Sequence, residues 1–412
     1  MNRNNRNKQI VISFVSFLAC ASMMSIMMPQ KGFSATENRY LKKRPAFTVK
    51  GLLDGSFGTD YETALSDQFP ARDAWIGIKV MAERAQGRRD VNGVYFGKDD
   101  YLIEKFDRED IEGEQLDRNL ETVAAFVQKA EETLGKDRVR VMMVPTASQV
   151  LTDRLPFLAA PYDQSRVTER LGELLAGASG GMAAEERFEM RADKTSGLAR
   201  QEEMAFLVSV EEMLAEHRQE NIYYKTDHHW TVLGAYYGYR AWAESVGITP
   251  WEQEAFTIQT VSDEFLGTVS SKVNLPQKPD SIELYLPKTE QGYEVCYDGD
   301  AKPSPMYAYQ ALEGKDKYAV YLDGNHGLTK IYCPAAAQGD GAGRKLLLIK
   351  DSFAHSFVPF AANHFEETYM IDLRYFNLSP QTFLEEKGIT DVLILYQIPG
   401  FAGEKTVSKL SW

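Results

Sequence analysis

The chain is 412 residues long, with 44% hydrophobic and 25% charged residues, a composition typical of a globular protein and not of a disordered or fibrous one. Its formal net charge is −13, which argues against a nucleic-acid backbone or an anionic membrane surface as the main partner of the folded part. We therefore expect no nucleic acid among the partners.

The N-terminus has the pattern of a membrane segment. Arg3, Arg6 and Lys8 precede the apolar run 10–28, which Pro29 ends. A basic flank followed by about twenty apolar residues is typical of a signal peptide or an uncleaved signal anchor. A buried core helix is the alternative, but the run has no polar face. We expect residues 1–36 to be a signal peptide or membrane anchor, and the protein to lie on the extracytoplasmic face of the cell membrane or to be secreted.

The three cysteines are too few to indicate a disulfide framework. Cys20 lies in the apolar run, and Cys296 and Cys333 lie beyond it. An exported protein can join the last two in one disulfide. No Cys/His spacing typical of a structural zinc site occurs, and we expect neither metal nor cofactor.

The elements expected after the anchor change from helical pieces to alternating strands and helices. Apolar spacing predicts helical pieces over 52–87, a hairpin over 93–106 and an amphipathic helix over 108–135. Short apolar runs predict buried strands at 138–147, 345–357, 367–377 and 391–400, with helices over 357–365 and 380–387 between them.

This alternation predicts an α/β fold, a three-layer αβα sandwich whose mostly parallel sheet is covered on both faces. We expect one domain over 37–412, with a β-rich insertion at about 261–333 where Tyr, Pro and Gly are frequent. In such sheets functional residues gather at the carboxyl ends of the strands.

Ser352 is the first candidate for chemistry. It follows the apolar strand 346–349 and precedes a helical pattern, so its hydroxyl is expected on a tight strand-to-helix turn beside free backbone N–H groups. The alternative is that Ser352 or Asp351 only caps the helix. A serine hydroxyl is a poor nucleophile without a base in reach, so the choice depends on finding one.

Asp227 and His229 in "TDHHWT" supply that base. In an extended segment residues i and i+2 share a face, so the carboxylate of Asp227 can hold one ring nitrogen of His229 while the other accepts a proton from Ser352. His228 is then expected to face away. A metal site is one alternative, although adjacent residues meet poorly at one ion. A helix cap formed by Thr226 or Asp227 is the other.

Four further residues are candidates for contacts with a substrate or an oxyanion. Trp230 begins an aromatic-rich helix that is more often core than a sugar platform, and Arg374 follows a strand where it can hold an oxyanion or pair with an acid. Gly267 and Asn325 lie in turns and are lesser candidates for an oxyanion site.

Several motifs together resemble a known family. The stretches "ENRYL", "LLDGSF", "SDQFPARDAW", "TDHHWT", "KDSFAHSFVPF" and "IDLRYF" are similar to the DHHW family of bacterial exported proteins, in the alginate O-acetyltransferase-like branch of the SGNH-hydrolase superfamily. The resemblance runs from about Glu37 to near the C-terminus. It implies a permuted SGNH-like αβα sandwich with Ser352 as nucleophile, His229 as general base and Asp227 as its orienting residue. Lys350 stands where SGNH hydrolases commonly carry glycine.

The resemblance also implies a function. Related proteins transfer acetyl groups to cell-surface polysaccharides, in some cases with a membrane-bound O-acyltransferase as acetyl donor. We therefore expect an extracytoplasmic O-acyltransferase that acetylates hydroxyls of a cell-wall or extracellular polysaccharide. A carbohydrate acetylesterase with the same triad, and a non-catalytic surface or assembly protein that keeps the fold, are the alternatives.

Overall fold

The computed structural model describes residues 3–34, 39–179, 206–299 and 302–412. It divides into two compact units, one of Met1–Asn92 with Ser270–Gln277 and one of Gly93–Val269 with Lys278–Trp412. The expected boundary between residues 36 and 37 lies outside the described residues, and the expected extent of the domain stays a prediction.

The first unit begins with the apolar helix α1 (Arg3–Met27). Its segment Asn5–Met27 is long and apolar enough to cross a membrane by length and composition, which agrees with the expected N-terminal segment. The other elements of this unit are short: β1 (Phe33–Ser34), β2 (Arg39–Tyr40), α2 (Val49–Leu53), α3 (Ser56–Asp67), α4 (Arg72–Ala85) and β3 (Asp90–Val91).

The second unit is built on a six-stranded sheet. Its strands lie in the order β6 (Val139–Val144), β13 (Asp391–Gln397), β11 (Lys345–Lys350), β12 (Glu367–Ile371), β10 (Leu328–Tyr332) and β9 (Glu294–Tyr297). The first four strands are parallel, and β10 is antiparallel to both neighbours. Uninterrupted apolar runs form the central strands because both faces are covered. The predicted, mostly parallel sheet is confirmed.

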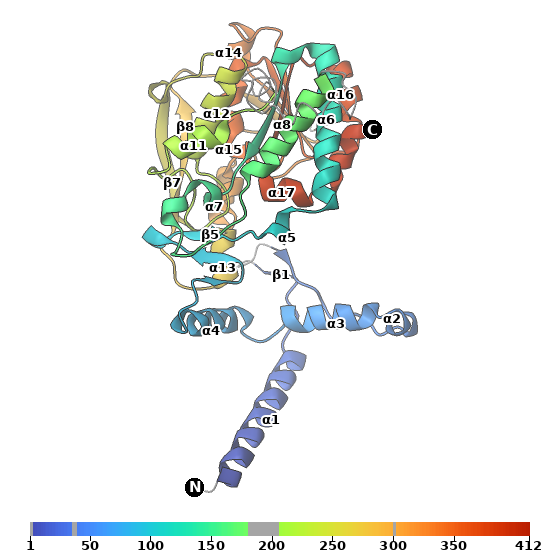
Figure 1. Cartoon of the computed structure of the whole chain (residues 1–412), viewed down its shortest axis with the longest axis vertical. Helices are drawn as coiled ribbons and strands as arrows, with labels where there is room; N and C mark the ends of the chain where they lie inside the picture. The colour runs from blue at the N-terminus through green and yellow to red at the C-terminus, as the bar shows by residue number, and fades with distance from the viewer. Residues whose placement is uncertain (1–2, 35–38, 180–205, 300–301) are drawn as a thin grey trace, which may run out of the picture. The chain divides into compact units, whose positions relative to one another are not determined.

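Helices cover both faces of this sheet (Figure 1). Side chains alternate along β11, so Leu346 and Leu348 belong to one apolar core while Leu347 and Ile349 belong to the other. The first core includes α11 (Val210–Glu216), α12 (Val232–Ser245) and α15 (Ala354–Ala361). The second includes α6 (Glu114–Leu134), α8 (Ser165–Ser179), α16 (Pro380–Lys387) and α17 (Ile398–Gly403). The expected three-layer αβα sandwich is therefore present.

Two hairpins lie outside this sheet. The predicted hairpin is formed by β4 (Val94–Phe96) and β5 (Leu102–Glu104), and a longer one by β7 (Phe256–Phe265) and β8 (Asp280–Pro287). The expected β-rich stretch at about 261–333 contains β8, but it also contains β9 and β10, which extend the main sheet.

The remaining elements of this unit are short helices. They are α5 (Arg108–Ile111), α7 (Ala147–Val150), α14 (Pro334–Ala337), and the 3-10 turns η1 (Lys98–Asp100), η2 (Lys136–Arg138), η3 (Thr152–Arg154), η4 (Gln253–Ala255), η5 (Tyr309–Glu313), η6 (Lys317–Val320), η7 (Ala362–His364) and η8 (Lys405–Ser411). The residues of α13 (Thr268–Val273) are divided between the two units. Cys296 and Cys333 are both unpaired, so the disulfide considered from the sequence is not formed.

Candidate active site

Ser352 lies in the tight turn between β11 and α15, at the carboxyl end of a central parallel strand. The side chain that bonds this turn is that of the neighbouring Asp351: its Oδ1 accepts from the Phe353 N–H at 2.9 Å, and its Oδ2 accepts from the Gln397 N–H at 2.7 Å. Burial raises the pKa of Asp351, and these two hydrogen bonds oppose the rise. Because Asp351 is the residue bonded to the turn and to β13, the Ser352 hydroxyl is left available for other contacts.

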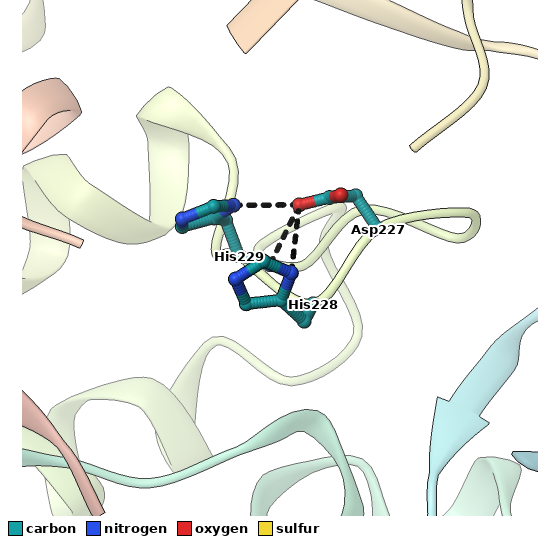
Figure 2. A group of neighbouring side chains, drawn as sticks. All are labelled: Asp227, His228 and His229. Carbon is teal, nitrogen blue, oxygen red and sulfur yellow. Dashed lines mark hydrogen bonds and ion pairs between the residues drawn. The ribbon is translucent and has the colours of Figure 1, made fainter. Parts of the chain in front are cut away.

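Asp227 and His229 are joined by two hydrogen bonds to one carboxylate oxygen. Asp227 Oδ1 lies 2.6 Å from His229 Nδ1 and accepts the His229 backbone N–H at 3.0 Å, and Figure 2 shows this oxygen facing both histidines. The segment is a bend and not the extended strand assumed from the sequence. The Asp227 side chain accepts a hydrogen bond from the backbone N–H two residues later in the chain, which is a common local bond of Asp in turns.

His229 also reaches Ser352. Its Nε2 lies 2.7 Å from Ser352 Oγ, although the two residues are 123 positions apart in the chain. With Nδ1–H donated to Asp227, the tautomer that this carboxylate favours, Nε2 is free to accept the Ser352 proton. The structure therefore brings Asp227, His229 and Ser352 into one continuous hydrogen-bonded relay.

The protonation states in the relay suit a base. Burial, and then the neighbouring His228, lower the pKa of His229 to about 4, while Asp227 acts in the opposite direction. Burial opposes ionisation of Asp227, but His228 and His229 outweigh it and hold the pKa of this carboxyl below its ordinary value. At neutral pH the relay is thus an aspartate beside a neutral imidazole, the form that can accept a proton.

Asp227 is held from its second oxygen as well. Its Oδ2 accepts from the Thr268 backbone N–H at 2.8 Å and from the Thr268 hydroxyl at 3.0 Å. Gly267 packs directly against Asp227, because a Cβ at Gly267 would lie 2.2 Å from the Asp227 Cβ and 2.3 Å from its Oδ2. This turn therefore positions the aspartate, a role different from the oxyanion contact for which Gly267 was a candidate.

Tyr318 is a further neighbour of His229 that no sequence motif indicated. Its ring stacks on the imidazole of His229 with centroids 3.9 Å apart and an interplanar angle of 13°. Its hydroxyl lies 3.0 Å from Ser356 Oγ and donates to the Ser352 carbonyl at 3.3 Å. Tyr318 belongs to a 3-10 turn far from both motifs, so no local pattern singled it out.

His228 does not face away, so that expectation was wrong. Its ring centroid lies 3.9 Å from that of His229, and its Nδ1 lies 2.8 Å from Thr268 Oγ1 and 3.6 Å from Asp227 Oδ1. One ligand atom from each of Asp227, His228 and His229 lies within 4.8 Å of the others, so the three are a possible metal-binding group. Both ring nitrogens of His229 are already bonded, to Asp227 and Ser352, so a metal at His229 would replace one of these bonds.

Trp230 and the helix that follows it have structural contacts. Trp230 is fully buried, and its indole N–H donates to the Phe353 carbonyl at 3.0 Å, so it ties the histidine segment to the serine turn. It has no exposed surface to offer a substrate. Thr231 caps α12 through a bond from the Gly234 N–H at 3.2 Å, so neither Thr226 nor Asp227 is the cap.

Arg374 and Asn325 belong to a charged cluster beside the serine strand. Arg374 donates to both oxygens of the buried Asp372, at 2.9 and 2.6 Å, and it also donates to Asn325 Oδ1 at 3.1 Å. The buried Lys350 donates to Asp372 at 3.2 Å, to Asn325 Oδ1 at 3.4 Å and to His355 Nε2 at 2.8 Å.

The charges of this cluster largely satisfy one another. Burial lowers the pKa of Lys350, and Asp372 opposes the shift. Burial, followed by Lys350, holds the pKa of His355 well below its ordinary value, which leaves the imidazole neutral as an acceptor for the lysine. Because Lys350 and Arg374 both bind Asn325 Oδ1, they fix the orientation of its amide group.

Comparison with known proteins agrees with this architecture. The sequence model of the DHHW protein family matches residues 199–371. A crystal structure of a DHHW family protein from Eubacterium siraeum is 24% identical, with a TM-score of 0.54, over 78% of this chain and 96% of that chain. Bacillus cereus PatB1, solved with a sulfonyl adduct, is 18% identical, with a TM-score of 0.53, over 75% of this chain and 97% of that chain. No curated protein matches the sequence. At these identities the two structures share the fold.

Proposed function

We propose that the chain is an extracytoplasmic O-acyltransferase that uses Ser352 as nucleophile. The match of the DHHW family model to residues 199–371, a segment that includes Asp227, His229 and Ser352, supports this proposal. The acceptor is a hydroxyl group of a cell-wall or extracellular polysaccharide, and the transferred group is acetyl. The observation that carries the proposal is the relay with 2.6 Å between Asp227 Oδ1 and His229 Nδ1 and 2.7 Å between His229 Nε2 and Ser352 Oγ. This is the geometry of an activated serine, recognised by roles and distances.

In the first half-reaction Ser352 Oγ attacks the carbonyl carbon of the acetyl donor while its proton moves to His229 Nε2. Asp227 stabilises the imidazolium through the bond to Nδ1. Collapse of the tetrahedral intermediate breaks the bond to the leaving group, which takes the proton from His229 Nε2. The product of this half-reaction is acetyl-Ser352 with a neutral His229.

In the second half-reaction an acceptor hydroxyl takes the place of the leaving group. His229 Nε2 removes the hydroxyl proton, the oxygen attacks the acetyl carbon, and the bond to Ser352 Oγ breaks as the proton returns to that oxygen. The sugar gains one acetyl ester and the enzyme is unchanged. Water in place of the sugar hydroxyl gives hydrolysis, so exclusion of water from the acceptor position favours transfer.

The oxyanion of each tetrahedral intermediate needs a donor near Ser352. In the described part of the chain the Ser352 backbone N–H makes no hydrogen bond, and it lies at the turn where a developing oxyanion forms. Asn325 is the second candidate donor, because its amide oxygen is occupied by Lys350 and Arg374 and its NH₂ is left for another partner. The acetyl donor we propose is a membrane-bound O-acyltransferase, on the assumption that α1 anchors the chain at the membrane.

The nucleophile can be tested by covalent labelling. The full-length protein is treated with phenylmethylsulfonyl fluoride, and the modified peptide is located by mass spectrometry. We expect one adduct on Ser352, none in Ser352→Ala, and a normal adduct in Ser411→Ala, a serine outside the proposed site whose hydroxyl donates to the Ser408 carbonyl. Labelling of Ser352→Ala to the native level would overturn the assignment.

Acyl transfer is tested separately. The protein is incubated with p-nitrophenyl acetate and oligosaccharide acceptors, and the glycans are examined for added acetyl groups. We expect acetylated glycan with the native protein and none with Ser352→Ala. Release of p-nitrophenol with no acetylated glycan for any acceptor would favour an acetylesterase. If chelation abolished the release and zinc restored it, the metal site at Asp227, His228 and His229 would replace the proposed relay.

A further inference from the structure

Exposed apolar side chains are concentrated in the first unit, outside the apolar helix α1. Soluble surfaces rarely expose large apolar residues in contiguous groups, and where they do, the group usually marks a contact with a protein or a membrane. In the second unit such residues are scattered over many elements. In the first unit they recur on α2 and α4: Val49, Leu52, Leu53, Trp75, Ile78 and Met81.

Helix α4 has two apolar faces, whereas a surface helix usually has one apolar face and one polar face. Gly77 and Val80 are buried on one face, and a Cβ at Gly77 would lie 2.6 Å from the Asn274 carbonyl oxygen of the same unit. Trp75, Ile78 and Met81 follow one another at intervals of three residues, so they line a second face, where each is 44–54% exposed. The contact with Asn274 accounts for the first face but does not explain why the second face is apolar and exposed.

The second face continues onto the apolar helix. The ring of Trp75 contacts the ring of Phe17 edge-on, with centroids 5.7 Å apart, and Phe17 lies near the middle of the segment Asn5–Met27. Near the other end of that segment, Arg44 donates to the carbonyl and the hydroxyl of Ser25. A cation at the C-terminal end of an apolar helix is the arrangement expected at the level of lipid headgroups.

The charge of this unit differs from that of the whole chain. Residues 1–92 contain 14 Lys and Arg against 8 Asp and Glu, whereas the whole chain contains 46 against 59. The net charge of −13 therefore conceals a basic N-terminal part and a more acidic remainder. A basic surface with exposed Trp, Leu and Ile is the composition that binds anionic membranes.

We propose that the α2–α4 segment, residues 47–85, is a membrane-docking surface that lies on an anionic phospholipid bilayer, with Trp75, Ile78 and Met81 inserted among the lipids. The inference rests on the proposed anchoring by α1, and it adds a second attachment. A helix anchor alone leaves the rest of the chain free to tilt and rotate about the linker. Docking of α4 fixes the unit against the bilayer surface.

Trp75 allows a direct test, because it is the one tryptophan in residues 1–92. The full-length protein is reconstituted into vesicles of phosphatidylcholine and phosphatidylglycerol, and the emission of Trp75 is obtained as the difference between the native protein and Trp75→Phe. Brominated phosphatidylcholine should quench at least half of this difference signal, and aqueous iodide should quench little of it. The quenching should fall in vesicles without phosphatidylglycerol.

Two variants keep the result interpretable. Ile78→Asp with Met81→Asp should abolish the lipid quenching of Trp75, whereas Ile258→Asp, an isoleucine of similar exposure in the second unit, should leave it unchanged. Flotation of the vesicles reports the anchor independently. Flotation without lipid quenching of Trp75 would overturn the docking surface and keep the anchor, and failure to float would overturn both. Neither result touches the Ser352 labelling, so the proposed chemistry is judged separately.

Discussion

Gly267→Ala is expected to disable the relay, although Asp227, His229 and Ser352 themselves are not substituted. The added methyl carbon would lie 2.2 Å from the Asp227 Cβ and 2.3 Å from Oδ2, well inside the roughly 3.5–4 Å at which carbon atoms pack. One of the two must therefore move by more than about 1 Å. If Asp227 moves, its 2.6 Å bond to His229 Nδ1 is broken, and if the turn at Gly267 moves, the bond from the Thr268 N–H that holds Asp227 is lost. Misplacement of this size costs on the order of 10²-fold in rate.

The assay is kcat/KM for p-nitrophenyl acetate, measured together with thermal unfolding. We expect a loss of at least about 10²-fold in Gly267→Ala. The control is Gly403→Ala, where a Cβ meets no atom within 4 Å and activity should be native. A folded Gly267→Ala protein with native kcat/KM would refute the reasoning that Asp227 must be held in place for His229 to act.

Four other outcomes are expected. Because the pKa of His229 is lowered to about 4, kcat/KM should hold from neutral pH down to about 5 and fall as pH drops through about 4; a fall centred near 6.5 in the pH profile would contradict the buried, neutral base. The unfolded chain binds that proton near pH 6.5, so stability should decline between about 6.5 and 4, and chemical denaturation at two pH values checks the sign. Lys350→Met leaves Asp372 paired with Arg374 alone, so it should lower the free energy of unfolding by up to about 3 kcal/mol. Urea titration measures this loss, and an unchanged unfolding midpoint would contradict it. Trp230→Phe removes the bond to the Phe353 carbonyl and should cost about 1–3 kcal/mol in the same titration; a loss below 0.5 kcal/mol would mean that this bond does not tie the two segments.

The sequence located the strands and the relay through local patterns. Apolar runs marked β6, β11, β12 and β13 because helices cover these parallel strands on both faces of the sheet. The position of Ser352 after such a run, and the two-residue spacing of Asp227 and His229, pointed to residues that the structure brings together. The physical reason for the spacing differs, since a bend and a backbone hydrogen bond replace the extended segment.

What the sequence did not reveal depends on contacts between distant segments. Thr268 bonds Asp227 from 41 positions further along the chain, and Tyr318 stacks on His229 from the 3-10 turn η6, which carries no motif. The sequence marks Gly267 as a turn residue. In the structure a glycine is needed there because Asp227 approaches its Cα closely, and no pattern within its own segment predicts that contact. Lys350 departs from the family pattern in the sequence. In the structure its buried ammonium group is hydrogen-bonded to Asp372, Asn325 and His355.

The strand order makes the serine turn depend on a strand that is synthesised after it. β13 lies between β11 and β6, its Leu395 carbonyl accepts the Asp351 N–H, and its Gln397 N–H donates to the Asp351 carboxylate. The turn that holds Ser352 is therefore incomplete until residues 391–397 have paired with β11. A chain shortened before β13 would keep Asp227, His229 and Ser352 but would lose part of the framework that holds the serine turn.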